Sequence, residues 1–305
     1  MNTCIFCNGE RKKIYNLNGY EIYQCINCKT SSVKDMPTIE EIKNYYNGFV
    51  AISPGRKKRI TQNLALKKWF ESFNLPPNAK LLDVGGGGGL IPYAFEKFGF
   101  GEGHYIDIDK ESCEFARDYL NLTSVINDDV KNLANYAHQK YDLPKYDLIY
   151  SRHVIEHLID PLDMINTLIN LLNDGAAFVL EFPNGMSLEN QGYRDVFIQR
   201  YKKLARSNNW GVLKTLSTMF SPKVANGIDP VRHLWAISSA GITAYLSKRD
   251  DIEFKILTAT LSNPVYSPYI THKNIMEKLH SAFIENTLGK IDGATHLVAI
   301  ITKKS

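Results

Sequence analysis

Long apolar runs are absent from this sequence of 305 residues. No stretch approaches the roughly 18 consecutive apolar residues of a membrane-spanning helix. The N-terminal segment MNTCIFCNGERKK also lacks the apolar core of a secretion signal. We therefore expect a cytoplasmic protein with no membrane partner. Hydrophobic residues make up 44% of the chain, which is enough for the core of a globular domain with an accessory module.

A large charge of one sign is also missing, because the net charge is only +4. This value argues against a protein devoted to binding polyanions. The charge is unevenly spread, since eight basic and two acidic residues fall between Gly192 and Trp235. The basic residues are Arg194, Arg200, Lys202, Lys203, Arg206, Lys214, Lys223 and Arg232. Such a segment can provide partners for the phosphate groups of a small anionic substrate.

Cysteine is scarce after residue 28, and four of the five cysteines lie within the first 28 residues. They form two C-x2-C pairs with 17 residues between them: Cys4, Cys7, Cys25 and Cys28. This spacing is typical of a four-cysteine zinc ribbon. Four cysteine ligands leave no open position, so we expect a structural Zn²⁺ ion. Disulfides and rubredoxin-like iron are the alternatives, and the fifth cysteine, Cys113, is predicted to pack in the core.

The dinucleotide fingerprint G-x-G-x-x-G/A is absent from the glycine-rich stretch KLLDVGGGGGL, residues 80–90. The pattern D-x-G-x-G-x-G fits instead, on Asp83, Gly85, Gly87 and Gly89. The apolar residues around Asp83 are typical of a buried strand, and glycines let the backbone approach a ligand before a helix begins. The stretch resembles the first motif of class I S-adenosylmethionine (SAM) dependent methyltransferases.

Further motifs follow in the order that this family shows. The strand-like GHYIDID ends near Asp107, 20 residues after Gly87, where an acid can accept hydrogen bonds from a ribose diol. The resemblance implies that Asp107 binds the SAM ribose and that Asp129 lies near the adenine. The cofactor positions that it implies beyond the first motif are Asp107, Ile108, Asp129, Val130 and Ser151.

Strand-like and helix-like segments alternate between residues 79 and 183, which predicts a parallel, doubly wound α/β sheet with its ligand at the carboxyl ends of the strands. The resemblance implies a Rossmann-like SAM-methyltransferase sheet with an antiparallel last strand. The C-terminal part is expected to contain a strand at 252–259, a helix at 274–288 and an edge strand at 295–304. We expect a zinc ribbon (1–35), substrate-side helices (36–78), a SAM-binding core (79–183), a lid insertion (184–248) and a C-terminal part that completes the core (249–305). The substrate-side helices are expected at 36–49, with a capping box on Thr38 and Glu41, and at 59–73. A further helix is expected to begin at Ser238 and Ser239.

The sequence after the fourth expected strand contains the pattern H-x-x-E-H, on His153, Glu156 and His157. These residues are three and four apart, so we expect them to share one face of a helix. The pattern matches a metalloprotease signature, which we reject because it directly follows a parallel strand and no third ligand is evident. Ubiquinone-type O-methyltransferases have E-x-x-E-H here, and this resemblance implies a divalent-cation site, although His153 replaces the first acid. Alternatively, Glu156 and His157 brace the helix against the core.

Residues 184–235 interrupt the alternation of strands and helices, and an insertion at this point is expected to form a lid over the substrate. The segment DPVRHLW, residues 229–235, with EFPNG upstream, resembles zinc-ribbon methyltransferases of deoxysugar and surface-glycan pathways. That resemblance implies that His233 is a general base. A lid histidine that is hydrogen-bonded for structure is the alternative.

These motifs predict methyl transfer from SAM to a hydroxyl, or less readily a carbon, of a small anionic metabolite, with His233 and His153 as candidate bases. A nucleotide-linked sugar or a phosphorylated surface-polysaccharide precursor would fit. The alternatives are a zinc-ribbon ribosomal RNA base methyltransferase and a catalytically inactive binding module. The segment SRHV lacks the N/D-P-P-Y tetrapeptide of many base methyltransferases, and the first 35 residues are poor in basic side chains, which argues against nucleic acid.

Overall fold

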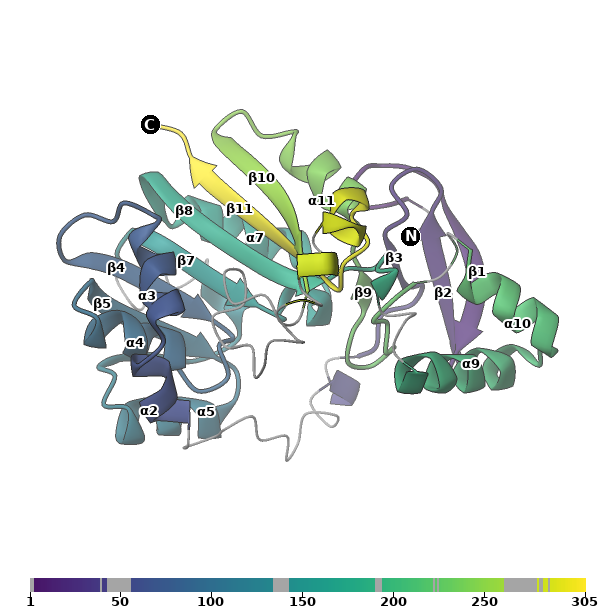
Figure 1. The fold of residues 1–305 in the computed structure, drawn as a ribbon, viewed down its shortest axis with the longest axis horizontal. Helices are drawn as coiled ribbons and strands as arrows, with labels where there is room; N and C mark the ends of the chain where they lie inside the picture. The colour runs from purple at the N-terminus through teal and green to yellow at the C-terminus, as the bar shows by residue number, and fades with distance from the viewer. Residues whose placement is uncertain are drawn as a thin grey trace.

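The structure is a computed structural model that describes residues 3–38, 40–42, 56–133, 143–189, 194–221, 223, 225–260, 279, 282–284 and 286–305. Its strands form two sheets, which lie in separate halves of the molecule (Figure 1). The larger has seven strands in the order β10-β11-β8-β7-β4-β5-β6, and the smaller has four in the order β1-β2-β3-β9. The expected α/β architecture is confirmed.

Five parallel strands form the middle and one side of the larger sheet. They are β4 (Ala79–Val84), β5 (Gly101–Asp107), β6 (Ser124–Asn127), β7 (Tyr146–Arg152) and β8 (Leu172–Pro183). Successive side chains of a strand point to opposite faces. Leu81 packs in a core with α3 (Leu64–Glu71) and α4 (Leu90–Lys97), whereas Leu82 packs in a second core with α7 (Pro161–Asn170). The strands are therefore apolar on both faces, as a doubly wound sheet requires.

The last strand, β11 (His296–Lys303), is antiparallel to both of its neighbours, β8 and β10 (Ile252–Ala259). The prediction of an antiparallel strand here is confirmed, but its position at the edge is wrong. β11 lies between β10 and β8, which explains why most of its residues are buried. The helix expected at 274–288 lies mostly outside the described residues, and a 3₁₀ turn follows at Leu288–Ile291.

The segment before the core differs from the single helix expected at 59–73. Two helices form instead, α2 (Arg56–Thr61) and α3, because the Asn63 side chain accepts hydrogen bonds from the backbone amides of Ala65 and Leu66 and so starts a new helix. The helix expected at 36–49 lies mostly outside the described residues. Its predicted capping box is present, since the Glu41 amide donates to Thr38 Oγ1 over 3.2 Å and the Thr38 amide donates to Glu41 Oε2 over 2.7 Å.

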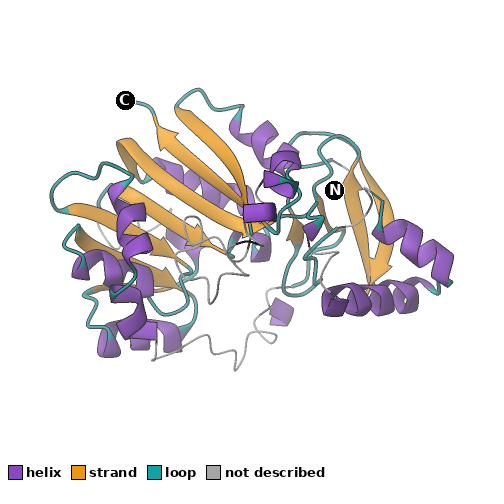
Figure 2. Cartoon of the chain, in the orientation of Figure 1, coloured by secondary structure: helices purple, strands orange, loops and turns teal. Residues whose placement is uncertain are grey.

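The smaller sheet combines the N-terminal region with part of the later insertion. Its first strands are β1 (Arg11–Leu17), β2 (Tyr20–Cys25) and β3 (Ser31–Val33), and β9 (Trp235–Ala236) pairs with β3. The basic helix α9 (Arg194–Asn208) lies beside β1, with α10 (Val212–Met219) next to it (Figures 1 and 2). The Asn16 amide donates to the Asn208 side chain over 2.7 Å.

The insertion, which was expected to form a lid over the substrate, divides between the two sheets. Its helices α9 and α10 lie on the side of the smaller sheet. Other parts contact the larger sheet, since the Leu234 amide donates to the Glu156 carbonyl and the Thr295 amide donates to Glu189 Oε2. The helix expected after Ser238 is present as α11 (Ser239–Leu246), capped by the Ser238 side chain. No helix within the described part of the chain has the length and apolar character to cross a bilayer.

Candidate functional site

The five-glycine segment forms a turn at the carboxyl end of β4 that only glycine tolerates. Gly85, Gly87, Gly88 and Gly89 have φ angles of 69°, 56°, 113° and 69°. A Cβ atom on Gly85 would lie 2.3 Å from Val154 Cγ2, and one on Gly86 would lie 1.9 Å from Asp83 Oδ2. Both separations are far shorter than a van der Waals contact. The turn thus brings backbone without side chains to the strand end, where the sequence motif predicts a ligand, while the amides of Gly85, Gly87 and Gly88 donate to Ile106, Asp107 and Tyr105.

The carboxylate of Asp107, at the end of β5, is fixed against this turn. Asp107 Oδ2 accepts hydrogen bonds from the Tyr105 hydroxyl (2.7 Å) and the Gly87 amide (3.3 Å), and Oδ1 accepts from the Asp109 amide (3.0 Å). Burial raises the pKa of Asp107, and these hydrogen bonds oppose that shift. Asp107 and Gly87 therefore lie together, as predicted, and the carboxylate retains acceptor capacity for a ribose.

Asp83 lies beneath the turn on β4 with its carboxyl group fully buried. Neither carboxylate oxygen has a hydrogen-bond partner among the described residues. Burial, and then the nearby charge of Asp107, raise the pKa of Asp83 well above its usual value. A buried carboxylate without a partner is costly. This group and the cradle of glycines fit a ligand such as SAM that brings polar or cationic groups to the turn.

The other predicted cofactor positions follow the ends of neighbouring strands. The Ser151 hydroxyl, on β7, donates to the Val84 carbonyl over 3.2 Å. Asp129 Oδ1 accepts from the Lys131 amide over 3.1 Å and caps a 3₁₀ turn. Val130 is buried in the core, and Ile108 is largely exposed. Their contact with a cofactor stays a prediction.

A cluster of four histidines and two carboxylates lies next to the glycine turn, at the carboxyl ends of β7 and β8. We call it the histidine cluster, and its members are His153, Glu156, His157, Glu181, His233 and His296. His153 Nδ1 lies 3.0 Å from Glu156 Oε1, and His157 Nε2 lies 3.7 Å from the same oxygen. The His157 and His233 rings are 4.6 Å apart between centroids. The structure thus brings both predicted catalytic histidines into one group.

The expected helical face formed by His153, Glu156 and His157 is wrong. His153 has a φ angle of 55° and lies in a bend, and Ile155–His157 form only a 3₁₀ turn. A helix cannot begin at His153, because the His153 amide still donates to the carbonyl of Glu181 on β8, the strand beside β7. The bend nevertheless directs both histidines to the same buried carboxylate, so the three residues lie together although they do not share a helix face.

The protonation states within the cluster follow from its burial. Burial alone would raise the pKa of Glu156, but the His153 hydrogen bond and the neighbouring histidines lower it to about 2. Burial lowers the pKa of His233 to about 4 and also lowers the pKa of His157. Burial likewise lowers the pKa of His296. At neutral pH the ionised Glu156 therefore lies beside neutral imidazoles of His157 and His233.

Sequence reasoning missed Glu181 and His296. Glu181, on β8, accepts hydrogen bonds from Arg152 Nε (3.0 Å) and the Tyr150 hydroxyl (3.1 Å). His296 Nε2 lies 3.1 Å from His153 Nε2. The sequence contained a signal for His296, because a strand that is antiparallel to its neighbour begins at the edge of the sheet where that neighbour ends. The first residue of β11 must therefore lie near the exit of β7.

The four N-terminal cysteines converge on one point. The Sγ atoms are 3.7 Å apart in the pair Cys4–Cys28 and 3.4 Å apart in Cys7–Cys25, and all four lie within 4.8 Å of one another. A tetrahedral Zn²⁺ with Zn–S bonds of about 2.3 Å places its sulfur ligands about 3.8 Å apart. All five cysteines of the described chain are free thiols, so the disulfide alternative is not supported. Cys113 is buried, as expected.

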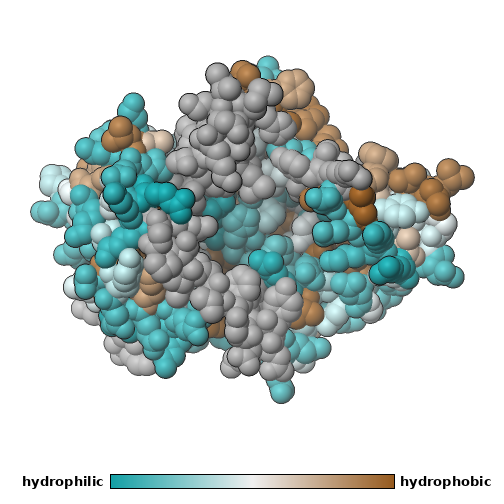
Figure 3. All heavy atoms as spheres, turned by 60° about the horizontal axis from the view of Figure 1, so that its bottom comes forward, coloured by the Kyte–Doolittle hydropathy of each residue, from teal (hydrophilic) through white to brown (hydrophobic). Residues whose placement is uncertain are grey.

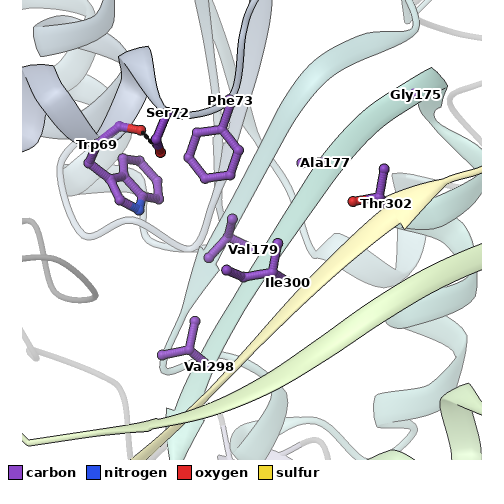
Figure 4. A pocket seen from close by; sticks show the side chains of 9 residues that line it. All are labelled: Trp69, Ser72, Phe73, Gly175, Ala177, Val179, Val298, Ile300 and Thr302. Carbon is purple, nitrogen blue, oxygen red and sulfur yellow. Dashed lines mark hydrogen bonds between the residues drawn. The ribbon is translucent and has the colours of Figure 1, made fainter.

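A cavity of about 350 Å³ lies elsewhere, between α3 and the faces of β8 and β11. Figure 4 shows that mainly apolar side chains line it, including Trp69, Phe73, Val298 and Ile300. None of its lining residues is titratable near neutral pH. Figure 3 shows a hollow near the middle of the face that it presents, where the described atoms are mostly hydrophilic. The titratable groups that could support acid–base chemistry lie in the histidine cluster and not in the lining of the apolar cavity.

Comparison with known proteins agrees with this geometry. A sequence model described as a methyltransferase domain matches residues 56–224, which include the glycine turn, Asp107 and most of the histidine cluster. The chain belongs to this methyltransferase-domain family. Its fold is that of the class I SAM-dependent methyltransferases, with a mostly parallel seven-stranded sheet and one antiparallel strand.

Curated relatives match parts of this methyltransferase-family chain. The ubiquinone biosynthesis O-methyltransferase of Shewanella sp. (strain ANA-3) is 32% identical over 96 residues, which cover 32% of this chain and 40% of that protein. The ribosomal protein L11 methyltransferase of Fusobacterium nucleatum is 27% identical over 173 residues, which cover 51% of this chain and 54% of that protein. The chain thus spans about half, or less, of the length of these relatives.

Solved structures cover more of the methyltransferase-family chain at lower identity. The plantazolicin methyltransferase BpumL in complex with SAH is 17% identical, with a TM-score of 0.44 and coverage of 87% of this chain and 90% of that one. A SAM-dependent methyltransferase of Thermotoga maritima is 12% identical, with a TM-score of 0.45 and coverage of 87% and 99%.

Proposed function

We propose that this chain is a SAM-dependent methyltransferase that acts on a hydroxyl, or less readily a carbon, of a small anionic metabolite. The observation that carries the proposal is the hydrogen bond between the Gly87 amide and the Asp107 carboxylate, which joins two strand ends into a cradle beside the histidine cluster. SAM carries its methyl group on a sulfonium, which is a good leaving group. The residues of the chain then have to orient the acceptor, exclude water and accept a proton.

His153 is the better placed of the two predicted bases. Glu156 Oε1 accepts only, so the 3.0 Å contact requires a proton on His153 Nδ1. That arrangement leaves Nε2 of a neutral His153 as an acceptor, in the way that a carboxylate orients a catalytic histidine. In the structure this atom lies 3.1 Å from His296 Nε2, so a substrate hydroxyl would replace His296 as its partner. The His153 side chain is 32% exposed, whereas that of Glu156 is 2% exposed. His153 can therefore reach a substrate while its partner stays buried.

The anionic acceptor is inferred from the basic insertion. The helix α9 lies beside β1 of the smaller sheet, so the part of the insertion near the histidine cluster is the better candidate for this role. Arg232 is the basic residue there, because its carbonyl contacts His157 and it directly precedes His233. A guanidinium at this place would pair with a phosphate group. A nucleotide-linked sugar or a phosphorylated surface-polysaccharide precursor has the required chemistry.

We also propose that the four N-terminal cysteines bind a structural Zn²⁺ ion. The ion would join the turn at Cys4 and Cys7 to the turn at Cys25 and Cys28 and so fix the smaller sheet. Four thiolate ligands would leave no position for substrate. The ion would therefore stabilise the sheet on which α9 and β9 pack, without taking part in methyl transfer.

Transfer of a labelled methyl group tests the proposal. Purified full-length chain would be incubated with methyl-labelled SAM and a panel of nucleotide sugars, sugar phosphates and the matching uncharged sugars. We expect label in phosphate-bearing sugars only, and less of it with Arg232→Gln. Transfer to the uncharged sugars at equal rate would contradict the anionic acceptor. The absence of transfer to every acceptor, together with undetectable SAM binding, would contradict the enzymatic function.

A further inference from the structure

Backbone carbonyl groups fix the ring orientation of two histidines in the cluster. His157 Nδ1 lies 2.7 Å from the Arg232 carbonyl oxygen, and His233 Nδ1 lies 2.8 Å from the Gly227 carbonyl oxygen. A carbonyl oxygen only accepts, so both Nδ1 atoms are protonated and donate. In a neutral ring, Nε2 is then the unprotonated nitrogen. This arrangement is typical of histidines that bind a metal through Nε2, since the carbonyl fixes both the tautomer and the ring orientation.

Glu156 provides the third group. Its side chain is buried, and Oε2 has no hydrogen-bond partner among the described residues, while Oε1 accepts from His153. A buried oxygen without a partner costs free energy unless a ligand reaches it. Potential ligand atoms of Glu156, His157 and His233 all lie within 4.8 Å of one another. Two imidazole nitrogens and one carboxylate oxygen are a common ligand set for divalent transition metals.

We propose that Glu156, His157 and His233 bind a divalent transition-metal ion, separate from the cysteine site, with coordination positions left open. The ligands come from the bend after β7 and from the loop before β9, so the ion would join the insertion to the larger sheet. Zn²⁺, Fe²⁺, Mn²⁺ and Co²⁺ accept this ligand set. Three protein ligands leave room for water or an oxygen of a substrate, unlike the closed site of four cysteines.

The neighbouring group of His153, Glu181 and His296 is less suited to a cation. Both oxygens of Glu181 accept hydrogen bonds, one from the Arg152 guanidinium and one from the Tyr150 hydroxyl. The positive charge of Arg152 opposes a second cation nearby. The two Nε2 atoms of His153 and His296 are 3.1 Å apart and can share one hydrogen bond without a metal. We therefore assign the ion to the first group.

Cobalt binding to the full chain tests this assignment. The metal-free protein would be titrated with Co²⁺ in reducing buffer while absorption is followed, since thiolate ligands give intense charge-transfer bands that imidazole and carboxylate ligands do not. We expect two equivalents for the unmodified chain, one with thiolate bands and one without. Glu156→Gln and His233→Gln should each lose the second equivalent and keep the first, which also reports that the chain is folded.

The His296→Gln variant is the matched control and should keep both equivalents. Cys4→Ser should lose the thiolate bands and keep the second equivalent, so the result does not depend on the ribbon. Binding of a single equivalent by the unmodified chain would overturn the proposal. Retention of the second equivalent in Glu156→Gln and His233→Gln, or its loss only in His296→Gln, would overturn the assignment in the same way. None of these readouts depends on methyl transfer.

Discussion

The Gly87 amide donates a hydrogen bond to Asp107 Oδ2 over 3.3 Å. This contact joins the turn after β4 to the end of β5, two neighbouring parallel strands that pair from Ala79 and Gly101 onwards. The carboxylate therefore has a fixed position relative to the backbone of the turn. A ligand that packs against the turn with one part and binds the carboxylate with another would be recognised over both strand ends.

Gly85 should not tolerate a side chain. Gly85→Ala combines a positive φ angle with a Cβ atom 2.3 Å from Val154 Cγ2. Gly175→Ala is the matched control, because Gly175 also has a positive φ angle but nothing within 4 Å of a Cβ atom. We expect Gly175→Ala to cost about 1–2 kcal/mol for its backbone conformation and Gly85→Ala to cost about 1–3 kcal/mol more for the contact. Urea unfolding measures both, and equal losses would contradict the close packing of the turn.

Asp83 should make stability depend on pH. Its folded-state pKa is raised by burial above the unfolded value, so the folded chain binds an extra proton between these two values. The stabilising effect of this group is present below the unfolded pKa of about 4 and is lost as the pH rises towards the folded pKa. Asp83→Asn removes the charge. The free energy of unfolding of the variant, relative to the unmodified chain, should therefore increase as the pH rises from about 4.

Urea unfolding of both proteins over a pH series, without SAM, provides this comparison. Contributions from other titrating groups largely cancel in the difference between two chains that differ only at Asp83. A difference that stays constant with pH would show that the Asp83 carboxyl group has an ordinary pKa in the folded chain.

Cys4→Ser should release one equivalent of zinc and destabilise the smaller sheet. The Cys4 and Cys28 sulfur atoms are 3.7 Å apart, so removal of one ligand opens the site. Cys113→Ser is the control, because Cys113 is equally buried but lies away from the ribbon, on α5 (Lys110–Glu114). Zinc content by elemental analysis and the thermal unfolding temperature measure the effect. Unchanged zinc in Cys4→Ser would show that the cysteines do not form the predicted site.

His153→Gln should lower turnover without weakening cofactor binding. A positioned general base typically contributes about 100-fold to 10,000-fold to the rate. His104→Gln is the control, since His104 is a half-buried histidine in the middle of β5, with Nδ1 3.1 Å from the Tyr146 hydroxyl. Steady-state kinetics with the acceptor found in the labelling panel measures turnover, and calorimetry measures the affinity for S-adenosylhomocysteine. Normal turnover in His153→Gln would remove His153 as the base.

The sequence was most informative where the structure is determined locally. The limits of β10, at Ile252–Ala259, the Thr38–Glu41 capping box and the Ser238 cap were all predicted, because each depends on residues close together in the chain. The order of glycines and acids also placed Asp107 beside the turn. Local patterns of side chains are thus enough for elements and for motifs at strand ends.

The errors concern contacts between distant segments. β11 was expected at the edge of the sheet, because its apolar pattern does not indicate how many strands lie beside it. His296 was missed because only the antiparallel pairing of β11 with β8 brings it near His153. The pairing of β9 with β3, more than 200 residues apart, likewise could not be read from local composition. The histidine cluster is therefore a product of topology, and sequence patterns revealed only its His153–His157 part and the isolated His233.

Calorimetric titration with S-adenosylhomocysteine tests most directly the claim that the glycine turn and Asp107 together bind the adenosyl donor. We predict binding to the unmodified chain and at least about tenfold weaker binding to Asp107→Ala, since hydrogen bonds to a charged group contribute about 1.5–3 kcal/mol each. Asp118→Ala, which removes an exposed acid from the π-helical segment Phe115–Tyr119, should bind as the unmodified chain does. Equal affinity of Asp107→Ala and the unmodified chain would contradict the account.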